Sequence, residues 1–219
     1  MKKLLFWMVL IVGIVALIGS CAKKDDETAA TAAADNTTST TSYISTTTTA
    51  SGSITVGSET MSGVYASECL TSASHIAIFV ALNVWPSEVK AYGNVFVVTG
   101  SDNISIELYT FTDTSCSTSS MSYKTVSDNV TVGSASGSNY PVTYNNQTQA
   151  ITVHTTAAET TTETLYSNTL DWTVGTPRVL SKLGQFKYGL WTLSGTTWYE
   201  ASSSSATPTS AGTVPHVKQ

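Results

Sequence analysis

The chain has 219 residues, of which 11% are charged, and a formal net charge of −5 at pH 7. Its 10 lysine and arginine residues are scattered rather than gathered into a basic stripe, so nucleic acid is not an expected partner. No second ligand lies at zinc-like spacing from Cys69 or Cys116, so neither a metal nor another cofactor is expected.

The N-terminus has the pattern of a bacterial export signal. Met1-Lys2-Lys3 is a basic start, the apolar run 4–19 follows it, and small residues precede Cys21. This run has 16 residues, which is shorter than the roughly 20 that a membrane-spanning helix needs. Residues 1–20 are therefore predicted to be a signal peptide.

The end of this signal, Ile18-Gly19-Ser20-Cys21, resembles the lipobox of bacterial lipoproteins. Ile18 stands where leucine is usual and Ser20 where glycine or alanine is commoner. The resemblance implies that Cys21 is acylated, becomes the mature N-terminus and anchors the protein in a lipid bilayer. The alternative is an uncleaved membrane anchor. The neutral Ala22 after the cysteine favours the outer membrane, with its periplasmic face or the cell surface as the expected location.

Residues 21–58 are rich in threonine, serine and alanine. Such a segment cannot bury enough apolar surface to offset the entropy lost on ordering, so it is predicted to be a lipidated, disordered linker.

Residues 59–201 have the composition of an all-β domain. Short stretches rich in Thr, Val, Ile, Tyr and Trp alternate with Gly, Ser, Asn and Asp. In 104–111, three aliphatic side chains share one face while Ser105 and Glu107 share the other, which predicts a strand with one wet face. Residues 202–219 read as a mostly irregular tail. The predicted strands are 63–68, 94–99, 104–111, 120–126, 129–132, 140–144, 149–155, 162–167, 170–174, 185–193 and 196–201.

Two segments have less distinct patterns. The apolar run 72–85 fits a buried strand or a helix, and its periodicity does not decide between them. In 86–93, proline at the start and glycine at the end are typical of a single helical turn.

Because the predicted strands are joined by short connections, we expect a single small antiparallel β-barrel of up-and-down topology. The alternative is a Greek-key β-sandwich.

Cys69 and Cys116 are the cysteines that remain once Cys21 is assigned to lipid. Export to an oxidising compartment favours a disulfide between them. Such a bridge would stabilise the fold by roughly 4 kcal/mol on the loop-closure model. The alternative is two free, buried thiols.

The segments SGVYASEC (62–69) and LYTFTDTSC (108–116) resemble a family of small bacterial lipoproteins. That family shares a Gly-x-Tyr/Trp-x-x-x-Cys opening and a Tyr-x-Asp-x-x-Cys segment. Phe111 stands in place of the second motif's tyrosine, and Thr207 replaces an arginine in the closing segment 207–218. The resemblance implies a disulfide and a small barrel similar to lipocalins, without an established activity. The matching residues are Gly63, Tyr65 and Cys69 in the first motif, and Asp113 and Cys116 in the second.

No catalytic signature is found, and an enzyme is not expected. The sequence lacks a nucleophile elbow, a His-Glu-x-x-His motif, a phosphate-binding glycine loop and a calcium loop. Asp113 is expected to accept hydrogen bonds from its own turn. His75, His154 and His216 are distant from one another in the sequence, and His75 and His154 are read as strand residues. Nothing fixes the separation of Asp171, Glu159 and Glu163, which a glycosidase pair would require.

Aromatic side chains gather near the C-terminus. Tyr188, Trp191, Trp198 and Tyr199 lie on two adjoining predicted strands, and Trp172 is nearby. Core packing explains such a group. The alternative is a pocket for a small apolar or sugar ligand, bordered by at least one of the three tryptophans. Alternation points Trp191 inward on the face that also carries Lys187, and leaves Trp198 nearer a rim.

Together these patterns predict a membrane-anchored envelope lipoprotein with a non-enzymatic β-barrel that binds an unknown ligand or partner. The alternative is a structural or surface-display module with a filled core and no small-molecule site.

Overall fold

The computed structural model describes residues 42–180 and 184–219. The predicted signal peptide, Cys21 and the linker up to residue 41 lie outside the described residues. The elements of the described part are β1 (Ile54–Val56), β2 (Glu59–Met61), β3 (Val64–Ala66), α2 (Ala73–Ala81), β4 (Ala91–Val98), β5 (Ile104–Phe111), β6 (Ser119–Val132), β7 (Tyr140–Val153), α3 (Thr156–Leu165), β8 (Arg178–Leu180), β9 (Gln185–Ser194), β10 (Thr197–Ser203) and β11 (His216–Lys218).

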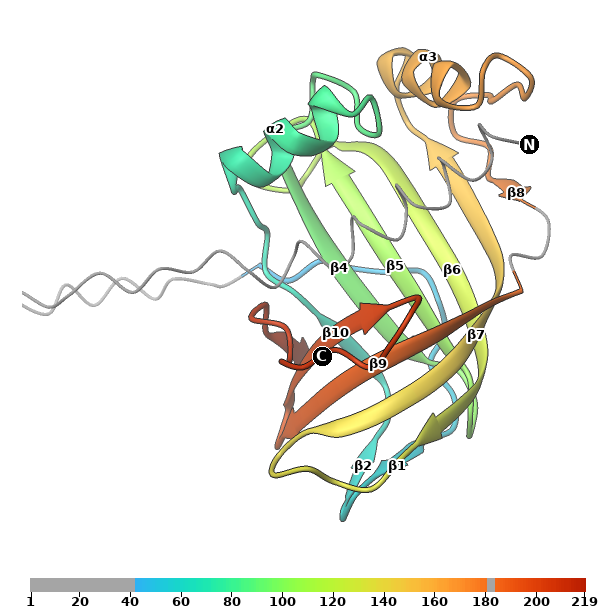
Figure 1. The fold of residues 1–219 in the computed structure, drawn as a ribbon. Helices are drawn as coiled ribbons and strands as arrows, with labels where there is room; N and C mark the ends of the chain where they lie inside the picture. Colours follow the sequence, from blue (N-terminus) through green and yellow to red (C-terminus); the bar gives the residue numbers. More distant parts are fainter. Residues whose placement is uncertain (1–41, 181–183) are drawn as a thin grey trace, which may run out of the picture.

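Within the described residues, eight antiparallel strands close a barrel in the order β3, β4, β5, β6, β7, β9, β10, β11, with β11 returning to β3. β9 pairs with the first half of β7, and the short β8 pairs with Gln149–Ile151 in its second half. The strands follow one another up and down in chain order (Figure 1). The predicted all-β antiparallel barrel is therefore confirmed over the sandwich.

β6 and β7 each join two of the predicted strands into one long strand. Each has 14 residues, and the register between them shifts at Val126/Ser127 and again between Asp128 and Thr131. Asn129 has φ +54° at the second shift, a left-handed conformation that asparagine tolerates better than most residues. The polar residues that suggested a turn thus form β-bulges that curve a continuous strand.

α2 resolves the ambiguous run 72–85 as a helix. Ser72 caps it by accepting a hydrogen bond from the backbone N–H of His75 at 3.4 Å. Its buried residues, Ile76 and Phe79, face the barrel. The segment 86–93 holds a hydrogen-bonded turn, in which the Val89 N–H donates to the Pro86 carbonyl, and then enters β4 at Ala91.

α3 corrects the prediction of a strand at 162–167. Thr155 caps the helix, its hydroxyl accepting from the Ala158 N–H at 3.1 Å, and Glu159 lies in the first turn. These start signals, together with the burial of Ala158 and Thr162, outweigh the β preference of the threonines. The expected strand 170–174 is instead a loop, whose Trp172 N–H donates to the Glu163 carboxylate at 3.1 Å. α2 and α3 lie at the same end of the barrel (Figure 1).

The tail 202–219, predicted to be mostly irregular, contributes strand residues to the barrel near both of its ends. β10 extends to Ser203, and β11 pairs with β10 on one side and β3 on the other. β11 has three residues, which is too short to show an alternating pattern in the sequence. It nevertheless closes the barrel.

Residues 42–58, which the sequence placed in the linker, pack against the barrel in the described part of the chain. Residues 42–52, which we call the N-terminal strap, run extended across the outer face of β3, β4 and β5 (Figure 1). Ile44 is 5% exposed and packs there with Val95 and Phe111. A Cβ atom at Gly93 would lie 2.3 Å from the Ile44 side chain, so the close approach of the strap requires glycine at this position.

The strap also changes the expectation of a wet outer face on β5. Ser105 and Glu107 point outward, as predicted, but both are buried beneath the strap.

Neither α2 nor α3, the helices of the described residues, has the length and apolar character needed to cross a membrane.

Candidate ligand-binding cavity

The disulfide between Cys69 and Cys116 is confirmed. The two Cα atoms are 5.8 Å apart and the bridge joins the segment after β3 to the loop after β5.

In the loop after β5, the Asp113 carboxylate accepts hydrogen bonds from the backbone N–H groups of Ser115, Ser117 and Thr118 at 2.7–3.0 Å. Hydrogen bonding from Ser117 and its neighbours holds the pKa of Asp113 well below its usual range. Asp113 therefore has the predicted role of ordering its turn.

A cavity of about 600 Å³ lies inside the barrel toward the α2 end. Part of its wall is apolar, with Phe96 of β4, Ile106 and Leu108 of β5, and Phe79 and Trp85 contributed by α2 and the segment after it. This volume is typical of a small-molecule site.

The segment 203–214, between β10 and β11, forms another side of this cavity. It is composed of serine, threonine, alanine, proline and other small residues. A Cβ atom at Gly212 would lie 2.1 Å from the carbonyl oxygen of Glu200. Glycine therefore lets the segment lie directly on the backbone of β10.

Four titratable side chains line the cavity from neighbouring strands. Tyr144 of β7 is the register partner of Lys187 of β9, so their side chains point into the barrel side by side. Glu200 lies on β10 and His216 on β11. Lys187 faces inward because it shares a strand face with Trp191, as alternation predicts.

Burial shifts the pKa values of these groups toward their neutral forms. Desolvation raises the pKa of Glu200 to about 7, although hydrogen bonds with Ser202 and Tyr144 and the charge of Lys187 oppose this rise. Burial lowers the pKa of Lys187, and the nearby Glu200 partly offsets that effect. Burial also raises the pKa of Tyr144. Burial therefore disfavours the charged forms of these groups.

Two of these groups have unfilled hydrogen-bonding capacity. Lys187 is 7% exposed, and among residues 42–180 and 184–219 no carboxylate oxygen lies within 4.0 Å of its ammonium. His216 is 3% exposed, and neither ring nitrogen has a well-formed hydrogen bond within the same residues. Desolvation lowers the pKa of His216 to about 4, with only partial compensation from the Trp198 backbone.

None of the three tryptophans proposed from the sequence lines this cavity. Trp191 and Trp198 are both 0% exposed, and their rings meet edge to face with centroids 5.0 Å apart. Trp198 is thus buried in the core rather than near a rim. Trp172 packs 5.0 Å from Tyr166 beneath α3, away from the other two. A ligand-binding role for these residues remains a prediction.

The sequence analysis did not identify Tyr144, Glu200 and His216 as site residues. Glu200 lies two residues after Trp198, and β-alternation therefore places it on the same inward face. This alternation is the feature of the sequence from which Glu200 could have been identified as a site residue. His75 lies in α2, not in a strand, and stacks on Tyr92 at the cavity with centroids 4.7 Å apart.

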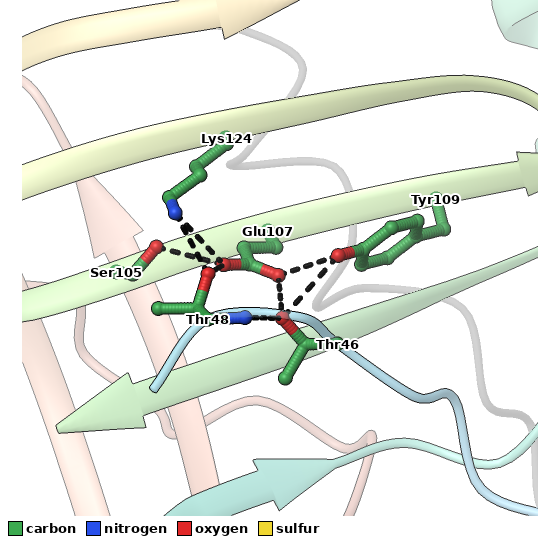
Figure 2. A network of polar contacts seen from close by, with 6 residues as sticks. All are labelled: Thr46, Thr48, Ser105, Glu107, Tyr109 and Lys124. Atoms are coloured by element: carbon green, nitrogen blue, oxygen red, sulfur yellow. Dashed lines mark hydrogen bonds and ion pairs between the residues drawn. The ribbon is translucent and has the colours of Figure 1, made fainter. Parts of the chain in front are cut away.

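A second buried polar cluster lies on the outer face, under the N-terminal strap (Figure 2). Glu107 is 1% exposed, and its carboxylate accepts hydrogen bonds from Thr46 at 2.5 Å, from Tyr109 at 2.6 Å and from Ser105 at 3.0 Å. Thr48 also donates to it. We call these residues and Lys124 the Glu107 cluster.

Lys124 completes this cluster. Its ammonium lies 4.0 Å from the Glu107 carboxylate and donates to the Thr48 hydroxyl at 2.7 Å. Every member of the Glu107 cluster thus has a partner within the chain. A groove of about 600 Å³ runs beside it along the strap, but the carboxylate itself fastens the strap to β5.

Comparison with known proteins gave no assignment. No family model matches the chain, and no curated protein shows significant similarity to it. In the described part of the chain, no three His, Cys, Asp or Glu side chains gather as metal ligands would. The chemistry of the site is therefore argued from the cavity and its residues.

Proposed function

We propose that this protein is a membrane-anchored lipoprotein of the bacterial cell envelope whose non-enzymatic barrel binds a small ligand in its interior cavity. The observation that carries the binding part is the pair Lys187 and His216, two buried side chains that line a cavity of about 600 Å³. Within the described residues, Lys187 has no carboxylate within 4.0 Å and neither ring nitrogen of His216 has a hydrogen-bond partner. Buried polar groups are normally hydrogen-bonded, so a bound molecule that supplies the missing partners is a direct explanation.

The anchoring part is supported by the lipobox-like sequence that ends in Cys21. Its test is the variant Cys21→Ser, expressed from the full chain. We expect the variant to keep its signal peptide, to lack acyl chains by mass spectrometry, and to leave the detergent phase on partitioning. An unchanged mature mass together with unchanged partitioning would contradict the lipoprotein assignment.

The binding part is tested by filling the cavity. Thr125 lines the cavity from β6, while the next residue, Val126, pairs with the outward-facing Ser105 and is 37% exposed. Thr125→Trp should therefore block the cavity, and Val126→Trp is the matched control on the opposite face.

The probe is N-phenyl-1-naphthylamine, a neutral apolar fluorophore. We expect saturable binding to the wild-type protein and to Val126→Trp, and a loss of about tenfold or more in affinity for Thr125→Trp, since an indole would occupy the probe's volume. Mass spectrometry of molecules that co-purify with the native protein would then identify the natural ligand. Equal probe binding by all three proteins, or none by the wild type, would favour the structural or display module.

A further inference from the structure

Lys187 brings a basic amine into an otherwise largely uncharged cavity. It is the one lysine or arginine among the described residues that line the cavity. Its neighbour across the β7–β9 pairing is Tyr144, whose hydroxyl is neutral. An isolated ammonium in an apolar environment is unfavourable unless a counter-charge accompanies it.

Glu200 is not an adequate counter-ion. Its charge influences Lys187, but its carboxylate oxygens lie beyond 4.0 Å of the ammonium. Burial raises the pKa of Glu200 to about 7, so near neutral pH a large share of this side chain is protonated. In that form Glu200 is a hydrogen-bond donor as well as an acceptor.

The part of the cavity wall near α2 and β5 is apolar and suits an apolar body. Phe79 and Trp85 stack with centroids 4.4 Å apart at the α2 end, and Leu108 and Ile106 continue this surface along β5. The polar and apolar walls enclose the same volume, so one molecule would contact both.

From this arrangement we infer that the cavity takes an amphiphile with a carboxylate head, which pairs with the Lys187 ammonium while its apolar chain lies against Phe79, Trp85 and Leu108. This inference rests on the proposed binding function and specifies its ligand class. Tyr144 of β7 and protonated Glu200 of β10, on the two strands that flank β9, line the same cavity and can donate to that carboxylate. His216 of β11, His75 of α2 and Tyr92 of β4 are the other titratable groups facing this volume.

The test compares decanoate, decanol and decylamine, which share one chain and differ in the head group. Each is titrated as a competitor of N-phenyl-1-naphthylamine at pH 6.5. We expect decanoate to bind wild-type protein about tenfold or more tightly than decanol, the size of effect expected for a buried charge-assisted hydrogen bond. Lys187→Met should abolish this preference and leave decanol affinity within about twofold.

Lys90→Met is the matched control, because Lys90 is exposed outside the cavity, and it should keep the preference for decanoate. Circular dichroism establishes whether Lys187→Met is folded, and Lys187→Gln provides a second variant with the charge removed. Glu200→Gln should strengthen decanoate binding at pH 8, where wild-type Glu200 is mostly ionised and repels the ligand.

The outcomes separate the two proposals. Equal affinity for decanoate and decanol, or tightest binding of decylamine, would overturn the carboxylate inference and leave the binding function intact. Failure of the probe and of all three competitors to bind would overturn the binding function itself. Retention of the decanoate preference in both Lys187 variants would also overturn the inference.

Discussion

Glu107 of β5 is buried on the outer face of the barrel sheet and Glu200 of β10 is partly buried on its inner face, and their surroundings differ. Glu107 faces outward and accepts hydrogen bonds from four side chains, with Lys124 close by. Glu200 faces inward, where desolvation raises its pKa to about 7 and Lys187 remains beyond ion-pair distance. The outer carboxylate has its hydrogen-bonding capacity filled by the chain, and the inner one lies in a polar group that is incomplete.

This difference separates a structural polar cluster from a candidate binding site. Composition alone does not distinguish them, because both clusters contain hydroxyl, lysine and carboxylate groups. The two clusters differ in whether their hydrogen-bonding groups have partners within the chain. A complete network rigidifies the fold, whereas an incomplete one leaves hydrogen-bonding capacity for another molecule. The outer region is also crosslinked, since Tyr43 of the strap pairs with Glu68, next to the Cys69–Cys116 disulfide.

The largest effect is expected from removing that disulfide. The double variant Cys69→Ala, Cys116→Ala should lower the free energy of unfolding by about 4 kcal/mol, because the bridge closes a loop with a sequence separation of 47. Urea unfolding measures the change, and wild-type protein treated with reductant is the control that should reproduce it. A loss below about 1 kcal/mol would show that the outer region is held without its crosslink.

A smaller loss is expected from Glu107→Gln. The amide keeps the shape of the side chain but removes the charge that four donors and Lys124 share, so we expect a loss of about 2–3 kcal/mol. Hydrogen exchange should show faster opening of the strap at the Ile44 and Ser51 amides, which donate to β3–β4 backbone carbonyls. Glu59→Gln, at an exposed position in β2, is the matched control. An unchanged strap would mean that Ile44 alone fastens it.

Much of the barrel could be predicted from the sequence because its strands carry their own signals. The alternation in 104–111 corresponds to β5, and the inward parity of Trp191 and Lys187 is borne out by the cavity and core. The cysteine count predicted the disulfide. These features depend on local periodicity or on chemistry that leaves few alternatives.

The strap and the polar site could not be found in this way, because each depends on distant partners. Residues 42–52 have the composition of a linker, and what orders them is a carboxylate 59 residues beyond Thr48. The cavity combines residues from β7, β9, β10 and β11, and β11 is too short to be recognised. Only the closed barrel brings Lys187, Glu200 and His216 together.

The smallest change in the free energy of unfolding is expected from Glu200→Gln. This variant makes the same chemical change as Glu107→Gln, but it should stabilise the protein where Glu107→Gln destabilises it. The pKa of Glu200 is about 7 in the folded protein against an ordinary value of 4.5. The wild-type protein should therefore lose stability as the pH rises from about 4.5 to about 7, since the unfolded chain releases this proton more readily than the folded one.

Glutamine carries no such proton, so Glu200→Gln should have a flatter pH profile. Each unit of pKa corresponds to about 1.4 kcal/mol, and access to Glu200 from the cavity reduces the effect, so we expect a gain of about 2 kcal/mol at pH 8 and little change at pH 4. His216, whose pKa is lowered to about 4, makes both proteins less stable as the pH falls below about 6.5, and this contribution cancels in their difference. Urea unfolding at several pH values measures that difference. A loss of stability at pH 8 like that of Glu107→Gln would mean that Glu200 is ionised and fully paired, and the contrast between the two carboxylates would then disappear.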